Sequence, residues 1–214
     1  MDGTFKNNNI NYEAIFVNDG STDNTLKIAN ESADENIKIV SYEKNKGKGG
    51  AVRTGMLASA GDIVFFTDCD LAYGLDVIKQ GYDMFGANPQ AGIIIGSRRL
   101  HKEGFASYNF LRKVMSHVFF IVLKVYGGIK QSDSQSGIKG FRKEAVKKIF
   151  NLCETDGWSF DFEILLIADK LGLKIAEMPV KIVNHRESKI RALADSIKML
   201  KEISIIKKRV KNIK

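Results

Sequence analysis

The 214-residue sequence predicts an α/β fold with a doubly wound, mostly parallel sheet. Short β-rich runs alternate with helical patterns through the first hundred residues, which is the order of parallel strands joined by helices. The run Asp62–Thr67 is apolar at its centre, which predicts a strand covered on both faces. An apolar content of 44% suffices for a packed core and is too high for a disordered chain.

The first half of the chain supplies most of the expected sheet. The first strand ends in the turn signal Asn18-Asp19-Gly20, and Ser21 or Asp23 can cap the helix that follows. The second helix begins after a glycine-rich turn. The expected strands are Tyr12–Val17, Ile37–Tyr42, Asp62–Thr67 and Ala91–Gly96, and the expected helices are Thr22–Ala33, Gly49–Ser59 and Leu75–Phe85.

The second half is less regular. Its last strand contains Pro179, which lacks an N–H for the ladder and therefore favours a sheet edge. Helices are expected at Tyr108–Tyr126, Lys143–Phe150, Phe160–Leu171 and Arg191–Val210, and a strand at Lys174–Val183. We expect residues 1–190 to form one domain and residues 191–214 to follow it as a basic amphipathic helix.

Composition and charge narrow the class of protein. Two cysteines, Cys69 and Cys153, argue against a disulfide framework and fit a reducing compartment. Three scattered histidines argue against a structural zinc site. The net charge of +8 is concentrated near the C-terminus, so it suits anionic lipid headgroups or nucleic acid. With no apolar run long enough to span a bilayer and no signal-peptide pattern, a soluble or surface-bound protein is expected.

Acidic residues follow two of the expected strands. Asp19 follows the first strand, and Asp68 and Asp70 follow the third. In doubly wound sheets ligands bind beyond the carboxyl ends of the strands. Two carboxylates one residue apart can share a divalent cation, with phosphate oxygens filling its remaining positions. A solvated acidic turn is the alternative interpretation.

Seven short motifs follow one another along the chain: Val17–Thr25, Asn45–Val52, Asp68–Asp70, Gly96–Arg98, Asp133–Phe141, Trp158–Glu163 and Ser188–Lys189. The first three together resemble the inverting glycosyltransferases of family 2. The later four resemble the dolichyl- and undecaprenyl-phosphate sugar synthases within that family, the glucosyl branch above all. The match covers about residues 12–190, and motifs in series are more specific than any one alone.

The resemblance implies a GT-A type fold and a donor site. It implies that Asp19 holds the base or ribose of the nucleotide and that Lys48 lies near it. It also implies that Asp68 and Asp70 bind Mg²⁺ or Mn²⁺ together with the diphosphate. From the residues alone, Asp19 could instead stabilise its own turn, and Lys48 could be a solvated lysine at a helix start.

The acceptor implied by the resemblance is a polyprenyl phosphate, whose anionic headgroup requires cations. Arg98 is the first candidate because it follows a strand at the same sheet edge, and Arg112 and Lys189 come next. Arg99 and Arg186 are substitutes, and any of them could be solvated surface charge. Asp133 is the matched candidate for a general base or for positioning the acceptor.

The resemblance also implies contact with a membrane. The segment Val114–Tyr126 is too apolar for a surface helix in water, so it either packs in the core or lies in the membrane interface. The basic C-terminal helix would add attraction to anionic headgroups. We therefore expect a cytoplasmic protein that is peripheral on the inner face of the membrane and serves cell envelope glycan synthesis.

The N-terminus departs from the resembled family. Members begin with a hydrophobic strand, a loop and a helix that Met1–Asn11 cannot supply. We hypothesise an N-terminally truncated or mis-started chain, whose sheet lacks its first strand.

The favoured function is transfer of a hexose, with glucose from UDP-glucose preferred, to a polyprenyl phosphate with inversion. The alternatives are mannose from GDP-mannose, a polysaccharide or protein acceptor, a noncatalytic nucleotide-sugar-binding module, and nucleic-acid binding. The last lacks any supporting motif.

Overall fold

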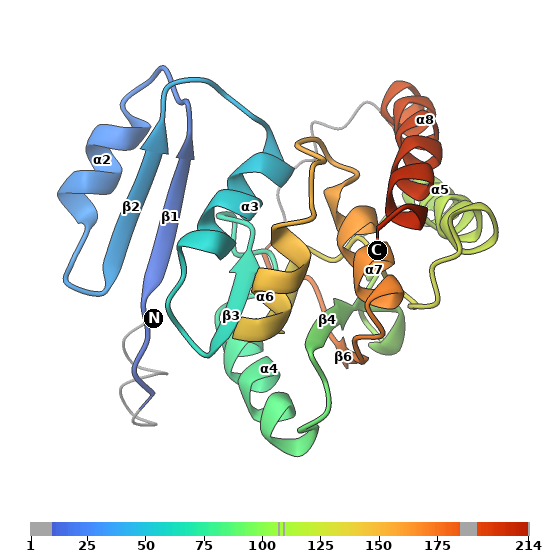
Figure 1. Cartoon of the computed structure of the whole chain (residues 1–214), viewed down its shortest axis with the longest axis horizontal. Helices are drawn as coiled ribbons and strands as arrows, with labels where there is room; N and C mark the ends of the chain where they lie inside the picture. The colour runs from blue at the N-terminus through green and yellow to red at the C-terminus, as the bar shows by residue number, and fades with distance from the viewer. Residues whose placement is uncertain (1–9, 107, 109, 185–191, 214) are drawn as a thin grey trace.

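The computed structural model describes residues 10–106, 108, 110–184 and 192–213, with the backbone alone at 111, 112 and 192–200. Strands and helices alternate through the first half, as predicted (Figure 1). The strands are β1 (Ala14–Asp19), β2 (Ile37–Tyr42), β3 (Ile63–Thr67), β4 (Ile93–Ser97), β5 (Ile138–Arg142) and β6 (Ile175–Pro179). The helices are α2 (Thr25–Ser32), α3 (Lys48–Ala58), α4 (Asp76–Ala87), α5 (Phe110–Val122), α6 (Lys143–Phe150), α7 (Phe160–Lys170) and α8 (Ala192–Lys211), with the short turns η1 (Arg98–Leu100) and η2 (Leu123–Gly127).

The strands form two sheets. β1 and β2 pair in parallel, and the other sheet has the order β3-β5-β4-β6. β6 lies at the edge and runs parallel to β4, which confirms the position expected from Pro179. β5 is antiparallel to both of its neighbours. It was not expected, because its sequence Ile-Lys-Gly-Phe-Arg places a lysine and a glycine inside the strand.

Alternate side chains of the four-stranded sheet enter two apolar clusters, as the period of a strand requires. Ile93, Ile95 and Phe141 are buried together with residues of α3, α6 and α7. Ile94 and Ile138 are buried with residues of α4. The doubly wound α/β class is therefore confirmed, with helices on both faces of this sheet.

β3 is covered on both faces, as predicted, because Val64 and Phe66 pack in one apolar cluster and Ile63 and Phe65 pack against the other, but the burial is partial. Only Phe66 of this strand is buried, and its other residues are half-buried. β1 is similar, since Asn18 is its one buried residue and the others are half-buried. β4, by contrast, is buried along its whole length. The difference arises because, among the described strands, β4 is paired on both edges, whereas β1 and β3 are each paired on one edge.

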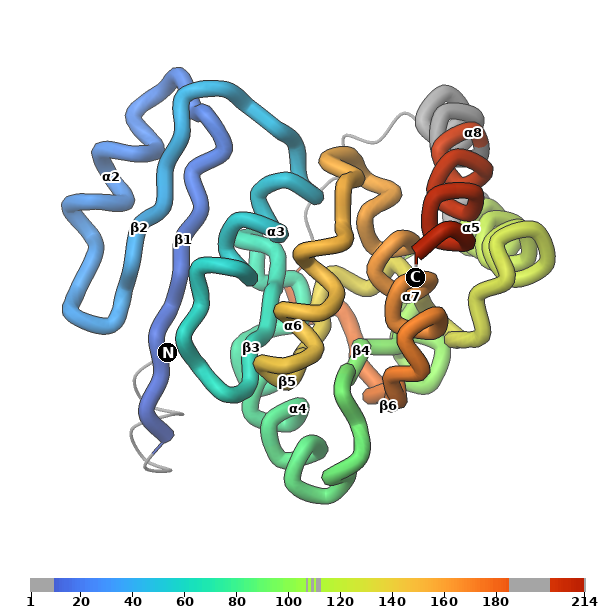
Figure 2. The backbone as a smooth tube through the Cα atoms, in the orientation of Figure 1, coloured from blue at the N-terminus to red at the C-terminus, as the bar shows by residue number. Residues whose placement is uncertain are grey.

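The C-terminal helix belongs to the same packed body. α8 lies beside α7 in the chain trace of Figure 2. Its residues Ile203, Ile206 and Val210 are buried in the larger apolar cluster. Among the described residues, no helix is both long and apolar enough to cross a bilayer.

Candidate functional site

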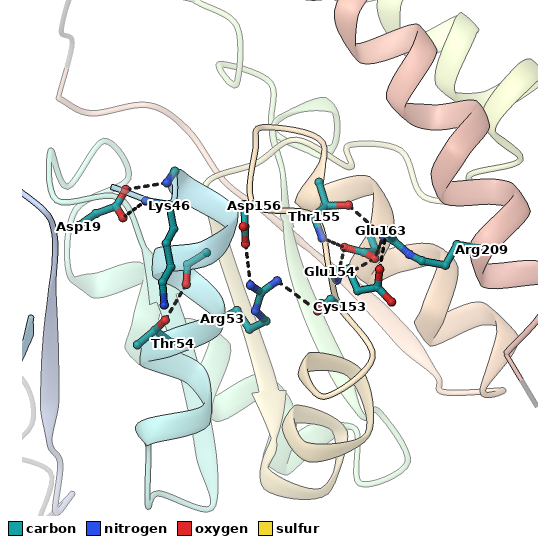
Figure 3. Close-up of polar contacts among 12 residues, drawn as sticks. Asp19, Lys46, Arg53, Thr54, Cys153, Glu154, Thr155, Asp156, Glu163 and Arg209 are labelled. Atoms are coloured by element: carbon teal, nitrogen blue, oxygen red, sulfur yellow. Dashed lines mark hydrogen bonds and ion pairs between the residues drawn. The ribbon is translucent and has the colours of Figure 1, made fainter. Parts of the chain in front are cut away.

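The loop between β2 and α3 is fixed by Asp19 at the end of β1. The Asp19 carboxylate accepts the backbone N–H groups of Lys46 at 2.7 Å and Gly47 at 2.9 Å (Figure 3). Its carbonyl oxygen accepts the Asn45 side-chain amide at 2.8 Å. Asp19 therefore holds a loop 27 residues further along the chain, rather than only its own turn, and this sets the start of α3.

Glycines in that loop allow a second loop to approach it. Gly47 has a φ of 94°, which favours glycine. Gly49 and Gly50 donate their N–H groups to the carbonyl oxygen of Asp156, at 2.7 and 3.3 Å. A Cβ on Gly49 would overlap with the backbone of the 153–159 loop. The glycine-rich turn thus joins two loops that lie far apart in the sequence.

Lys48 lies between these loops and the end of β3. Its Nζ is 2.7 Å from Asp68 Oδ1 and 5.2 Å from the centre of the Trp158 ring. Burial lowers the pKa of Lys48, but the carboxylates of Asp161 and Asp68 outweigh this effect and raise the pKa overall. Lys48 is therefore a charged, half-buried partner of Asp68 and not a freely solvated lysine.

The turn after β3 carries the two expected metal ligands. Asp70 Oδ1 accepts the N–H of Ala72 at 3.1 Å. Leu71 has a φ of 49° and is the sole described non-glycine residue with a positive φ. Such conformations are costly and tend to be kept at functional sites. A Cβ on Gly137 would overlap with Asp68 Oδ2, so the segment before β5 also depends on a glycine beside this turn.

The donor atoms at this turn fit a hard divalent cation. Asp68 and Asp70 supply carboxylate oxygens one residue apart, and Mg²⁺ and Mn²⁺ prefer such ligands. In the described part of the chain, no group of three or more histidine, cysteine or acidic side chains could hold a metal ion. Asp68 and Asp70 would therefore leave most coordination positions to other oxygens, as expected for a cation shared with a diphosphate.

Arg98 and Asp133 form a buried ion pair. Arg98 Nε and Nη2 lie 2.6 and 2.8 Å from the two Asp133 oxygens, and the Arg98 N–H donates to the same carboxylate at 3.1 Å. Arg98 Nη1 donates to the Tyr108 hydroxyl at 2.8 Å. Burial disfavours the ionised acid, yet Arg98 outweighs it and holds the pKa of Asp133 below its ordinary value of 3.8. The guanidinium predicted to bind an acceptor phosphate is thus engaged by Asp133.

A second buried pair was not singled out from the sequence. Lys139 of β5 is fully buried, and its Nζ lies 2.6 Å from Asp161 Oδ1 and 2.7 Å from the Ser136 carbonyl oxygen. Burial raises the pKa of Asp161 although Lys139 and Lys48 oppose that shift. The available signal was a lysine between apolar residues in Ile-Lys-Gly-Phe, which has to be paired if the run is a buried strand.

The predicted residues therefore form two groups joined by one segment. Asp19, Lys48, Asp68 and Asp70 lie around the loop that precedes α3 and the turn that follows β3. Arg98 and Asp133 form the second group, and Asp133 precedes Gly137, which abuts Asp68. Arg112 lies in α5 with only its backbone described, while Lys189 and Arg186 lie outside the described residues.

The 153–159 loop is held from the other side by α8 (Figure 3). Glu163, fully buried in α7, accepts the N–H groups of Glu154 and Thr155, at 3.1 and 2.8 Å. Arg209 of α8 bonds the same Glu163 carboxylate and the Thr155 hydroxyl. The C-terminal helix is thereby linked through this loop to Gly49 and Lys48.

Comparisons with known proteins identify the family of the chain. The family model described as Glycosyl transferase family 2 matches residues 4–150. The dolichyl-phosphate beta-glucosyltransferase of Saccharomyces cerevisiae is 33% identical over 214 residues, covering 92% of this chain and 64% of the relative. The corresponding proteins of Dictyostelium discoideum and Homo sapiens are 34% and 32% identical, with 61% and 64% of their lengths covered. The chain thus spans less than two thirds of the curated relatives it matches.

Solved structures support the fold. Glucosyl-3-phosphoglycerate synthase from Mycobacterium tuberculosis, in complex with Mn²⁺, UDP and glucosyl-3-phosphoglycerate, superposes with a TM-score of 0.66. The identity is 19%, and the match covers 94% of this chain and 70% of that one. At this identity the likeness shows the fold alone.

Proposed function

Because the chain belongs to glycosyl transferase family 2, we propose that it acts in transfer of glucose from UDP-glucose to a polyprenyl phosphate. The observation that carries the proposal is the contact of Lys48 with Asp68, beside Asp70 and Gly137, at the carboxyl end of β3. The relatives named above are glucosyltransferases with a dolichyl-phosphate acceptor. They favour glucose over the mannose alternative.

The donor is held beside the carboxyl ends of β1 and β3. Asp68 and Asp70 bind a divalent cation, Mg²⁺ or Mn²⁺, together with the diphosphate, and Lys48 lies beside them. When bound, the cation neutralises charge that develops on the departing UDP. UDP and Mn²⁺ in the structural relative support this pairing of ligands. Asp19 fixes the loop from Lys46 to Lys48. From its place at the end of β1, Asp19 also contacts the nucleotide.

The reaction is a direct displacement at the anomeric carbon. An acceptor phosphate oxygen forms the new bond to C1 of glucose while the bond from C1 to UDP breaks, which inverts the configuration. A phosphate oxyanion is already nucleophilic, so no strong base is required. Since Asp133 is held ionised with a lowered pKa, it is a weak base, and this supports a role in positioning Arg98 and the 133–137 segment.

The acceptor headgroup binds beside η1 and α5. A groove of about 410 Å³ there is lined by Arg99, Lys113, His117 and the apolar residues Phe105, Val114 and Val118. The Arg99 guanidinium lies 4.0 Å from the centre of the Phe120 ring. Cations next to apolar walls suit a phosphate carried on a lipid tail. Arg98 is committed to Asp133, so Arg99 is its natural substitute, and Arg112 and Lys189 remain further candidates.

The protein docks on the inner face of the cytoplasmic membrane through the same side. Apolar residues at helical spacing are exposed along α5 and η2, from Phe110 at 83% and Val118 at 55% to Val125 at 80%. This exposure favours the interface interpretation of the segment over core packing. We propose that residues 1–190 form the catalytic domain and that residues 191–214 form a basic C-terminal helix, which adds positive charge at the membrane.

The test is transfer of radiolabelled glucose from UDP-glucose to undecaprenyl or dolichyl phosphate in detergent, with Mg²⁺, with Mn²⁺ and with EDTA. We expect label in the organic phase with either metal and none with EDTA. The Arg99→Ala variant should transfer more slowly with unchanged UDP-glucose binding. Lys38→Ala, which removes a cation at an exposed position of β2, is the matched control.

Two results would redirect the proposal. Label transferred only to a soluble acceptor, with none in the organic phase, would contradict the lipid phosphate. UDP-glucose binding without transfer to any acceptor would support a noncatalytic nucleotide-sugar-binding module instead.

A further inference from the structure

Trp158 is the one tryptophan of the chain, and its side chain is left in contact with water. It is 58% exposed and belongs to neither apolar cluster, although tryptophan is among the side chains that gain most from burial. Ligand sites are lined by apolar and aromatic side chains. The exposure of Trp158 therefore points to a ligand rather than to the core.

The loop that carries Trp158 is fixed on both sides of this residue. On one side, the carbonyl oxygen of Asp156 accepts the Gly49 N–H at 2.7 Å. On the other side, the fully buried Ser159 donates its hydroxyl to a carboxylate oxygen of Glu202 in α8 at 2.5 Å. Trp158 is thus presented in one place by its neighbours, so little ordering of the loop is needed when a ligand binds.

The Trp158 ring lies beside the turn that carries the expected metal ligands. Lys48 Nζ is 5.2 Å from the centre of this ring and 2.7 Å from Asp68 Oδ1. The ring centre is therefore no further from Asp68 Oδ1 than the sum of these two distances. Because an ammonium group is attracted to the π face of an indole, the ring turns a face toward this space.

The position of the ring suits the sugar end of the proposed donor. A cation bound to Asp68 and to a phosphate oxygen, each at about 2.1 Å, brings the hexose on that phosphate to within a few ångströms of the Asp68 side chain. The nucleotide end lies elsewhere, because Asp19 bonds the loop at Lys46 and Gly47, before Lys48. The hexose is therefore the part of the donor that meets the indole.

We propose that Trp158 binds the glucosyl group of the donor by stacking its indole on the C–H face of the sugar. The ring hydroxyls of a glucosyl group are equatorial, so each face of the sugar presents C–H groups, which the negative π face of an indole attracts. Trp158 thereby sets the preference of the site for UDP-glucose over UDP. The inference rests on the proposed function, because it takes UDP-glucose as the donor.

Intrinsic fluorescence tests the contact directly, because all tryptophan emission of the protein comes from Trp158. With Mg²⁺ present, UDP-glucose should shift the emission saturably, since the sugar shields the ring from water. UDP at saturation fills the nucleotide end alone and should produce a much smaller shift. Vesicles of anionic lipid form a third arm, because exposed tryptophans also favour membrane interfaces.

Calorimetry of variants measures the contribution of the ring. Trp158→Ala should weaken UDP-glucose binding by about tenfold and leave UDP binding within about twofold of the parent. Trp158→Phe should keep most of the affinity because it retains a π face, whereas Trp158→Leu, which is apolar without one, should not. Tyr82→Ala, at an exposed aromatic position of α4, is the matched control and should bind both ligands as the parent does. Circular dichroism checks that each variant is folded.

The outcomes separate this inference from the proposed function. Metal-dependent UDP-glucose binding without an emission shift, or equal losses of UDP-glucose and UDP affinity in Trp158→Ala, would overturn the inference and leave the donor site standing. Emission that responds to vesicles and not to UDP-glucose would overturn it too, and would assign Trp158 to the membrane. Absence of any UDP-glucose binding by the parent would overturn the proposed function and this inference with it.

Discussion

At the scale of single residues, the site contains two buried ion pairs and a glycine backbone that lies close to a carboxylate. Arg98 with Asp133 and Lys139 with Asp161 are paired and mostly shielded from water. A buried ion pair adds little stability beyond apolar packing, but loss of one partner leaves an uncompensated charge. Each of these pairs is therefore sensitive to the removal of either member.

Asp133→Asn tests the first pair. The variant should lose roughly 3–5 kcal/mol of unfolding free energy at pH 7, because Arg98 stays buried without its carboxylate. The folded-state pKa of Asp133 is depressed below 3.8, so its contribution is present above that pH and is lost as the pH falls through the folded-state pKa. Urea unfolding from neutral to strongly acidic pH should show a steeper acid loss in the parent than in the variant. Equal acid slopes would contradict the assignment.

Gly137→Ala tests the close approach at Asp68. The added Cβ would overlap with Asp68 Oδ2 and displace this carboxylate from Lys48. We expect weaker UDP-glucose binding, by about tenfold or more, measured by calorimetry with Mn²⁺. Gly86→Ala is the matched control, because nothing lies within 4 Å of a Cβ there and alanine favours the helix. Unchanged binding in Gly137→Ala would show that Asp68 is not part of the donor site.

At the scale of elements, the C-terminal helix positions a loop of the site. Arg209 of α8 reaches Glu163, which holds the backbone of the 153–159 loop, and Asp156 of that loop holds Gly49 and Gly50. Arg53 adds a bond to Asp156 Oδ1 at 2.6 Å. Among the described residues, Arg209 contacts none of Asp19, Lys48, Asp68 and Asp70. It acts on the donor site only through Glu163 and the 153–159 loop.

Arg209→Ala should therefore raise the KM for UDP-glucose several-fold with a smaller change in kcat, because the loop beside Lys48 loses its support. Arg209→Lys should restore part of the effect. Lys208→Ala, at the exposed neighbouring position, is the control. A fall in thermal stability without any change in KM would mean that Arg209 serves packing alone.

The elements also show what sequence reasoning can reach. The predicted bounds of β2 and α6 match the observed bounds, because both segments have a clear apolar periodicity. β5 was missed because Lys139 and Gly140 interrupt its apolar pattern, and the lysine is tolerated only through Asp161 and the Ser136 carbonyl. The roles proposed for Asp68 and Asp70 followed from motif order, whereas the pairing of Arg98 with Asp133 is a long-range contact that spacing does not encode.

At the scale of the whole molecule, the donor-side loops and the exposed stripe of α5 lie on different elements of one packed body. The apolar stripe from Phe110 to Val125 and the basic residues of α8 belong to neighbouring segments (Figure 1). The proposed membrane docking would use both features, with apolar side chains inserted and basic side chains attracted to anionic headgroups.

If the protein docks on a membrane as proposed, Val118→Glu combined with Val125→Glu should weaken binding to vesicles containing anionic lipid by about tenfold or more, because each substitution adds a negative charge to the docking face. Ile28→Glu, an exposed apolar position on α2, is the control. Cosedimentation with vesicles measures the effect. Equal sedimentation of the variant and the parent would rule out this face as the docking surface.

The central claim is that the carboxyl end of β3 is a metal-dependent nucleotide-sugar site. Calorimetry of UDP-glucose binding with Mn²⁺ and with EDTA tests it most directly, using the parent, Asp70→Asn and the control Asp76→Asn in the first turn of α4. The account predicts binding that requires the metal, is lost in Asp70→Asn and is kept in Asp76→Asn. Binding by Asp70→Asn that equals the parent, with the same metal requirement, would contradict it.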